Sequence, residues 1–476
     1  MTARVVVVGG GVTGLTAAHR LLATAGDRVR LTLLESSDRL GGNVRTFREG
    51  GLVFDGGPDA FVVNKRAASD LCRELGLGPR LIETQEENRR VYIGRDRDLH
   101  LLPDGVVLTI PTRVMPLART KLLSWAGKLR MGLDLVRPPK KDGVDESIAS
   151  FVRRRLGDEA YERLADPLMG GIYAGDCEEL SIQSTFPQLP ELEAKYGSLV
   201  RGILATRPKH VPGVPPPSAF YALKGGMGEL IDALEASVRD RGGEILTGFA
   251  VKSVGHGMAA GARLRVIAED RAGAALALDA DHVILASPAH ASARALGELS
   301  PAAARELGEV PYVSTATLVM SFDRKEIAHP MDSVGIVLPK SAGRRILAIT
   351  FVTSKWEGRA PEGTAVLRVF FGGYRREGDA ALSDEELIRL GRSELHEVLG
   401  ITAEPQVARV FRYPKSNPQP VVGHKDRLAR IRRAVSDVPG LHAGGAAYDG
   451  VGLPDCVRQA NEMAARILAE MGRTAT

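Results

Sequence analysis

The stretch Val5-Val6-Val7-Val8-Gly9-Gly10-Gly11-Val12-Thr13-Gly14-Leu15 decides the fold of this chain. It reads as a strand, a glycine-rich turn and the start of a helix that runs to about Ala25. A second apolar run, Leu31 to Leu34, stops at Glu35, about 20 residues after the last glycine of the turn. Strand, glycine turn, helix, strand and acid in this order predict a dinucleotide-binding βαβ unit.

Each glycine of this turn has its own physical task. Gly9 permits the tight turn out of the strand, Gly11 leaves the backbone open to a pyrophosphate, and Gly14 lets the helix pack on the sheet. The unpaired N–H groups at the helix start favour phosphates, and Glu35 is placed for ribose hydroxyls. A plain glycine-rich turn is the alternative. We expect the nucleotide to contact Gly9, Gly10, Gly11, Val12, Thr13, Gly14, Glu35 and Ser36.

Composition narrows the class of protein. The chain has 476 residues, 44% of them hydrophobic, enough for two or three domains with large cores. The sequence contains no apolar run of about 18 residues, so we expect no transmembrane helix. The first predicted strand begins so early that we also expect no signal peptide. Three widely spaced cysteines without a Cys-x-x-Cys pair indicate a reducing compartment and no metal site. The net charge of +5 suits acidic ligands or an anionic membrane surface, and no dense basic run indicates nucleic acid.

Two further glycine segments follow the βαβ unit, Arg39-Leu40-Gly41-Gly42-Asn43-Val44-Arg45-Thr46 and Phe54-Asp55-Gly56-Gly57-Pro58-Asp59. Taken alone, they allow a flexible loop and an ordinary β-turn. In this order they resemble the large flavin family that contains amine oxidases, phytoene desaturases and porphyrinogen oxidases. The resemblance implies FAD, although some relatives carry an aromatic or basic residue in place of Asn43. It places beside the flavin Arg39, Gly42, Asn43, Gly57, Pro58, Asp59 and Ala60.

The central segment is the most specific part of the sequence. It runs from Glu146 to Gly157 and continues as Asp166-Pro167-Leu168-Met169-Gly170-Gly171-Ile172-Tyr173-Ala174-Gly175-Asp176. Its pattern predicts two helices, a glycine-rich turn and a helix with a serine cap. It also resembles the oxygen-dependent porphyrinogen oxidases of haem biosynthesis, as do Lys224 to Leu230 and Phe371 to Gly373. One departure is Pro418-Gln419-Pro420, where the family commonly has Pro-Gln-Tyr.

The stretch Ala446 to Cys456 places a glycine-rich turn between a predicted strand, Leu441 to Gly445, and an amphipathic helix. Such a turn suits a phosphate or carbonyl group, and in the family it approaches the flavin ring. The resemblance assigns this contact to Ala446, Val451, Gly452 and Leu453, and assigns the adenine to the backbone of Val251. The two ends of the chain are therefore expected to meet at one FAD.

The fold class that follows is α/β with α+β elements. We expect a discontinuous Rossmann-like FAD-binding domain, a mixed-sheet substrate domain and a helical domain that could face a membrane. Their predicted ranges are 1–88 with 222–300 and 436–476, then 89–110 with 301–435, and finally 111–221.

The resemblance implies the reaction. A porphyrinogen loses six electrons and six protons, O₂ is the acceptor, and three H₂O₂ are released. The substrate is protoporphyrinogen IX or coproporphyrinogen III, with a slight preference for protoporphyrinogen IX. No catalytic side chain is assigned, because a flavin accepts the hydride itself.

The substrate residues are assigned by alignment with the family. Arg89 matches the arginine that anchors a propionate, and a solvated loop arginine is the alternative. Lys65 is a weaker anchor candidate. Four positions match pocket walls, with ordinary strand packing as their alternative: Gly335, Val337, Thr350 and Phe370.

The segment Pro116 to Val136 predicts a basic amphipathic helix with a tryptophan, which fits a membrane interface or the surface of the helical domain. We expect a cytoplasmic protein, peripheral on the inner face of the cell membrane, with homodimer formation and hand-over to the next haem-pathway enzyme as further expectations. Two other functions stay open. One is a related amine oxidase or carotenoid desaturase, and the other is a non-enzymatic flavoprotein.

Overall fold

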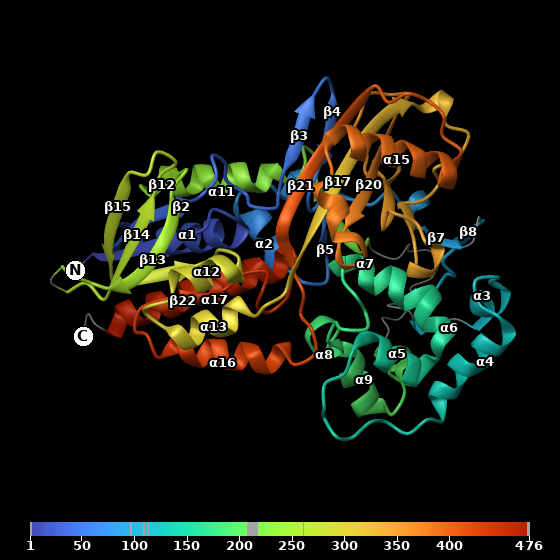
Figure 1. The fold of residues 1–476 in the computed structure, drawn as a ribbon, viewed down its shortest axis with the longest axis horizontal. Helices are drawn as coiled ribbons and strands as arrows, with labels where there is room; N and C mark the ends of the chain where they lie inside the picture. The colour runs from blue at the N-terminus through green and yellow to red at the C-terminus, as the bar shows by residue number, and fades with distance from the viewer. Residues whose placement is uncertain are drawn as a thin grey trace.

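A parallel five-stranded sheet at one end of the molecule carries the N-terminal βαβ unit (Figure 1). The computed structural model describes residues 2–95, 98–107, 110–111, 114–206, 218–259 and 261–473. The order of the parallel strands is β12 (Glu244–Thr247), β2 (Val29–Glu35), β1 (Ala3–Val8), β16 (His282–Leu285) and β22 (Leu441–Ala443). The sheet therefore joins the beginning, middle and end of the chain, as the sequence predicted.

Both faces of this sheet are covered, because β1 is apolar at every position from Val5 to Val8. Val5 and Val7 pack with α1 (Val12–Ala25), α11 (Gly228–Asp240) and α17 (Leu453–Arg473). Val6 and Val8 pack towards a small antiparallel sheet and three helices on the other face. That sheet consists of β13 (Ala250–His256), β14 (Leu264–Glu269) and β15 (Ala275–Ala280), and the helices are α12 (Ala289–Ala295), α13 (Pro301–Gly308) and α16 (His424–Ser436).

Two of those helices correct a predicted domain boundary. The range 301–435 places α13 and nearly all of α16 in the substrate domain. However, Leu307 of α13 and Ile431 of α16 share a buried cluster with Val6 and Leu285 of the parallel sheet. Both helices therefore pack with the parallel sheet, because their apolar faces have their partners there.

The second large sheet has seven strands in the order β21-β17-β20-β19-β18-β7-β8. All neighbours are antiparallel except β18 and β7. Helix α15 (Asp384–Leu399) covers one face of this sheet. Leu387 and Leu395 of the helix belong to the hydrophobic cluster that lies between the helix and the sheet. The strands are β21 (Val407–Pro418), β17 (Tyr312–Asp323), β20 (Thr364–Gly372), β19 (Ala348–Phe351), β18 (Gly335–Val337), β7 (Val91–Arg95) and β8 (Asp98–Leu101).

A helical domain lies beside this sheet and below it in Figure 1. Its core includes Phe151, Leu164 and Met169. Within it, a π-helix covers Tyr161–Gly170 and precedes the turn at Ala174. The helices are α3 (Val114–Arg119), α4 (Trp125–Gly132), α5 (Ile148–Leu156), α6 (Asp158–Ala160), α7 (Gly171–Tyr173), α8 (Ile182–Thr185), α9 (Gln188–Tyr196) and α10 (Leu199–Thr206).

The single helix predicted from Pro116 to Val136 is wrong. The chain forms α3, a turn, α4 and the 3₁₀ turn Leu133–Leu135. Ser124 caps α4 by accepting a hydrogen bond from the Gly127 N–H, and the Lys128 ammonium bonds the carbonyl oxygens of Ala118 and Thr120. These two contacts stabilise the break, because they satisfy backbone groups that a continuous helix would pair internally.

Smaller elements connect these parts. The hairpin β3 (Thr46–Glu49) and β4 (Leu52–Asp55) and the sheet of β5 (Phe61–Val62), β11 (Phe220–Leu223) and β6 (Leu81–Glu83) follow the βαβ unit, and β9 (Val106–Val107) pairs with β10 (Ile110–Pro111). The predicted ranges 89–110 and 111–221 include 96–97, 108–109, 112–113 and 207–217, which lie outside the described residues. No helix among the described residues is long and apolar enough to span a membrane.

Candidate active site

A cavity of about 560 Å³ lies at the carboxyl ends of the parallel strands, the edge where open α/β sheets bind ligands. Residues from both ends of the chain line it, from Gly9 to Cys456. Most of the predicted cofactor residues are among them: Gly9, Gly11, Val12, Thr13, Glu35, Ser36, Arg39, Gly42, Asn43, Pro58, Val251, Ala446, Val451 and Leu453.

The glycine turn has the geometry that a dinucleotide requires. Gly9 has φ +109°, and a Cβ atom there would lie 2.9 Å from the Ala286 carbonyl oxygen. A Cβ atom on Gly14 would lie 1.9 Å from the Gly9 carbonyl oxygen, so this glycine permits the helix to contact the turn. A Cβ atom on Gly11 would meet no atom within 4 Å. Gly11 therefore faces the open cavity, where a pyrophosphate can approach the backbone.

Glu35 ends β2 with its carboxylate at the cavity wall. Its Oε2 accepts a hydrogen bond from the Gly10 N–H at 2.7 Å, and its Oε1 accepts from the Ser37 N–H at 2.8 Å. The hydroxyls of Ser37 and Ser36 lie 2.9 Å and 3.3 Å from the same Oε1. The acceptor position left for a ribose hydroxyl is therefore on Oε2, for which the described residues provide only the Gly10 N–H.

The second glycine loop is held by Arg39. Its guanidinium donates to the carbonyl oxygens of Leu40, Gly42 and Val44. Burial and the neighbouring Arg45 lower the pKa of Arg39, while nearby acids oppose the change. Arg39 thus fixes a loop in which Gly41 and Gly42 both have positive φ, and it adds positive charge near the expected phosphates.

The other predicted cofactor residues, Gly10, Gly14, Gly57, Asp59, Ala60 and Gly452, are not among the cavity-lining residues. Asp59 instead accepts hydrogen bonds from Lys355 Nζ at 2.8 Å and Trp356 Nε1 at 3.1 Å. Burial opposes its charge, but Lys355 and Arg368 hold the pKa of Asp59 well below its usual range. Arg368 also donates to the Gly57 carbonyl oxygen at 2.6 Å. The turn is thereby tied to the seven-stranded sheet.

Several cavity residues were missed from the sequence. Ser287, Pro288 and His290 follow β16, so the rule that ligands lie beyond the carboxyl ends of parallel strands could have found them. Tyr413 and Lys415 come from β21 of the other sheet. No local pattern marked them, because their position depends on how the two sheets pack.

The four predicted pocket-wall residues share one face of the seven-stranded sheet. Gly335 pairs with Thr350, and Val337 and Phe370 both pair with Ala348, so these four positions lie on the same side of the sheet. Arg368 pairs with Thr350 and reaches Gly57 from this face. The face therefore looks towards the FAD-binding domain.

The helical domain meets the seven-stranded sheet through its π-helix. Val337 of β18 and Val451 of the cavity both pack against its core cluster. Asp166 accepts hydrogen bonds from the Lys340 N–H at 2.9 Å and from Arg375 at 2.6 Å. The central segment is thus placed where the cavity, the sheet face and the helical domain come together.

Arg89 and Lys65 already have acidic partners. Arg89 Nη2 lies 3.2 Å from Glu83, and Arg89 Nε donates to the Thr84 carbonyl oxygen. Lys65 Nζ lies 2.7 Å from Asp455 in the first turn of α17. Neither side chain is among the residues that line the cavity.

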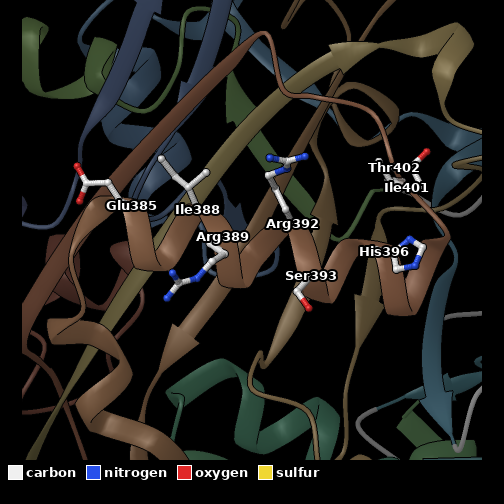
Figure 2. A pocket seen from close by; sticks show the side chains of 8 residues that line it. All are labelled: Glu385, Ile388, Arg389, Arg392, Ser393, His396, Ile401 and Thr402. Atoms are coloured by element: carbon white, nitrogen blue, oxygen red, sulfur yellow. The ribbon is translucent and has the colours of Figure 1, made fainter.

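A separate open groove follows α15 on the opposite face of the sheet (Figure 2). Its polar side chains include Glu385, Arg389, Arg392 and His396, and they are spread along the helix without converging on one point. We assign no chemistry to this groove.

The fold and the cavity define a flavin-dependent oxidoreductase. Residues 12–468 match the family of flavin-containing amine oxidoreductases, and the chain belongs to that family, whose cofactor here is FAD. The chain is 34% identical over 462 residues to the coproporphyrinogen III oxidase of Bacillus subtilis (strain 168), with 96% of each protein covered. It is 27% identical to protoporphyrinogen oxidase 1, chloroplastic, of Spinacia oleracea, covering 97% of this chain and 84% of that protein. The chain also aligns with the crystal structure of a protein from Exiguobacterium sp. 255-15 that is named as a protoporphyrinogen oxidase. The TM-score is 0.85, the identity is 34%, and 99% of each chain is covered.

Proposed function

We propose that the chain is an FAD-dependent porphyrinogen oxidase of haem biosynthesis. The observation that carries the proposal is the near full-length similarity to the B. subtilis enzyme, which covers the cavity, the sheet face and the central segment alike. The geometry supports it, because a flat substrate needs a broad surface beside the flavin. The face containing Gly335, Thr350 and Phe370 offers such a surface.

We further propose coproporphyrinogen III as the physiological substrate. Relatives from B. subtilis and Staphylococcus aureus, at 34% and 32% identity, are named coproporphyrinogen III oxidase, whereas the spinach protoporphyrinogen oxidase is more distant at 27%. This proposal replaces the slight preference for protoporphyrinogen IX in the sequence analysis.

Bound FAD supplies the electron-accepting chemistry. In the overall reaction, one porphyrinogen loses six electrons and six protons and becomes one porphyrin. Three O₂ molecules accept these electrons and protons and leave as three H₂O₂. The protein holds the macrocycle between the sheet face and the helical domain. Gly335 is proposed to contribute only backbone to this wall, since a Cβ atom there would lie 2.1 Å from the Ile349 carbonyl oxygen of the neighbouring strand.

Arg89 is proposed to bind a substrate carboxylate. Its ion pair with Glu83 is partly exposed, with 24% and 47% of the two side chains accessible. Such pairs contribute about 0–1 kcal/mol, so a propionate can replace Glu83 at low cost. Lys65 is the less suitable anchor, because Asp455 at 2.7 Å is itself only 11% exposed.

We also propose a peripheral contact with an anionic membrane. The apolar ridge, defined as Trp125, Leu129, Leu133 and Val136, lies on α4 and the residues that follow it. Trp125, Leu129 and Val136 are 69%, 72% and 76% exposed, and the Lys128 ammonium lies 4.5 Å from the centre of the Trp125 ring. Exposed apolar side chains flanked by cations favour the interface of an anionic bilayer.

Two expected protein partners can be tested separately. Light scattering would test the expected homodimer, and co-purification with the next haem-pathway enzyme would test the expected hand-over.

The deciding experiment compares both porphyrinogens aerobically, following porphyrin fluorescence and H₂O₂ together. We expect a higher kcat/KM for coproporphyrinogen III and three H₂O₂ per porphyrin. A preference for protoporphyrinogen IX would overturn the substrate proposal. Peroxide production from amines, without any response to either porphyrinogen, would overturn the proposed function in favour of an amine oxidase.

A further inference from the structure

Two buried histidines meet at the end of the parallel sheet that is remote from the FAD cavity. His282 is the first residue of β16, and His442 is the middle residue of β22. They are 160 positions apart in the chain, yet His282 Nδ1 lies 3.3 Å from His442 Nε2. The rings are 3% and 8% exposed. Their sequence separation explains why the sequence predicted no metal site.

A carboxylate completes the cluster. Glu470 lies in the last turn of α17, three residues after the buried Ile467, and its Oε2 is 3.8 Å from His282 Nδ1. One ligand atom from each of His282, His442 and Glu470 lies within 4.8 Å of the others. The carboxylate is 34% exposed, which leaves a route from solvent to the cluster.

The spacing suits a tetrahedral ion. Two nitrogens bound to one Zn²⁺ at about 2.0–2.1 Å in tetrahedral geometry lie about 3.3 Å apart. That separation matches the distance between the two ring nitrogens. Glu470 Oε2 lies 3.8 Å from His282 Nδ1 and within 4.8 Å of the ring nitrogen of His442, so the carboxylate has to move towards both rings to bind the same ion. A side-chain rotation at the end of a helix can supply this movement.

We propose that His282, His442 and Glu470 bind a divalent metal ion of the zinc type, with water as a fourth ligand. Two imidazoles and one carboxylate form a known kind of zinc ligand set. Its role here would be to hold the last turn of α17 to β16 and β22. The first turn of α17 contributes Leu453 and Cys456 to the FAD cavity, so the ion would stabilise the helix that closes the site. This inference is independent of the substrate.

Two neighbouring arginines oppose the ion, because after burial and His282 the charges of Arg466 and Arg263 also lower the pKa of His442. Arg263 Nη1 lies 3.6 Å from Glu470 Oε2 and competes with a cation for the carboxylate. Because Arg263 is 39% exposed, solvent screens its charge and its side chain can turn away. The proposal therefore predicts that Arg263→Gln strengthens metal binding.

The test uses the full-length FAD-loaded protein after treatment with a chelator. Zn²⁺ is titrated by calorimetry, Co²⁺ binding is followed by d–d absorption at longer wavelength than the flavin bands, and Tm is measured with and without Zn²⁺. We expect one Zn²⁺ per chain, a tetrahedral Co²⁺ spectrum and a higher Tm with Zn²⁺. The Glu470→Gln substitution, at a partly exposed position, should weaken binding about tenfold or more, and His442→Gln should abolish it.

His256→Gln is the matched control, because His256 is exposed on β13 and outside the cluster. It should bind Zn²⁺ as the unsubstituted protein does. The proposal is overturned if the unsubstituted protein binds no Zn²⁺. Equal binding by the Glu470→Gln and His256→Gln proteins would also overturn it, as would a loss of affinity in Arg263→Gln.

Discussion

The guanidinium of Arg368 lies 3.3 Å from Oδ2 of Asp59, and this buried pair joins the seven-stranded sheet to the turn that follows the second glycine loop. Replacing Arg368 with Met would leave the Gly57 carbonyl oxygen without this donor and Asp59 with less positive charge. Because Asp59 keeps Lys355 and Trp356 as partners, the main loss is a Gly57 carbonyl oxygen without its donor, which costs about 1–3 kcal/mol. We expect a fall of that order in the free energy of unfolding by urea, together with weaker FAD retention.

Arg409→Met is the control for this substitution. Arg409 lies on the neighbouring part of the same sheet, but its side chain is 52% exposed and its contact with Glu49 is 4.0 Å. It should change stability by less than about 0.5 kcal/mol. Equal effects of the two substitutions would remove the special role of the buried pair.

Substitution of Gly11 by Val separates cofactor binding from folding. The new side chain would enter open cavity space without striking the protein. We expect the apoprotein to keep its Tm while FAD affinity is lost, measured by flavin absorbance after reconstitution. Gly132→Val is the control, because a Cβ atom on this glycine of α4 would meet no atom within 4 Å. This variant should keep both its Tm and its affinity for FAD. A Gly11→Val protein that purifies yellow would refute the pyrophosphate assignment.

Arg89→Ala tests the proposed carboxylate anchor. A group remote from the reacting carbons contributes mostly uniform binding, so KM should rise more than kcat falls. Arg90→Ala is the matched control, because Arg90 pairs with Asp332 at 2.8 Å and is 45% exposed. Steady-state kinetics with coproporphyrinogen III give both constants. Unchanged kinetics for Arg89→Ala would indicate a solvated arginine.

The apolar ridge gives a separate prediction. Leu129→Glu places a carboxylate on the surface proposed to meet anionic lipid, so binding to phosphatidylglycerol vesicles in a flotation assay should fall several-fold. Leu204→Glu, at a 51% exposed position on α10, should not change binding. If both variants bind as the unsubstituted protein does, the ridge does not carry the membrane contact.

Buried histidines predict acid sensitivity. Burial lowers the pKa of His19, and the hydrogen bond that Glu74 accepts from the ring only partly opposes the change. The unfolded chain takes up this proton near pH 6.5 and the folded chain at lower pH. The contribution of His19 to the free energy of unfolding is therefore fully present above about pH 6.5. It declines as the pH falls from about 6.5 towards the pKa of His19 in the folded chain.

Urea unfolding between about pH 8 and pH 5 measures this decline. His19→Gln should flatten the slope, whereas His396→Gln, at an exposed position on α15, should leave it unchanged. An unchanged slope in His19→Gln would contradict the pKa assignment.

Local patterns predicted much of the fold. Val5 to Gly14 and the strand at His282 were readable because parallel strands buried on both faces form continuous apolar runs. The break between α3 and α4 was missed, since it depends on Lys128 bonding the preceding carbonyl groups. Tyr413, Lys415 and the His282–His442 pair were also missed, because only tertiary packing brings them to their places.

The strand order of the parallel sheet also sets the order of assembly during synthesis. The fourth strand, β16, is not made until residue 285, and β22 and α17 follow only after residue 440. Until β16 is made, the nascent chain carries β1 with one unpaired, apolar edge. Such edges are prone to aggregate. The FAD cavity described above is complete only once the chain has been made as far as Cys456, so any protection of the β1 edge is needed earlier than the cofactor.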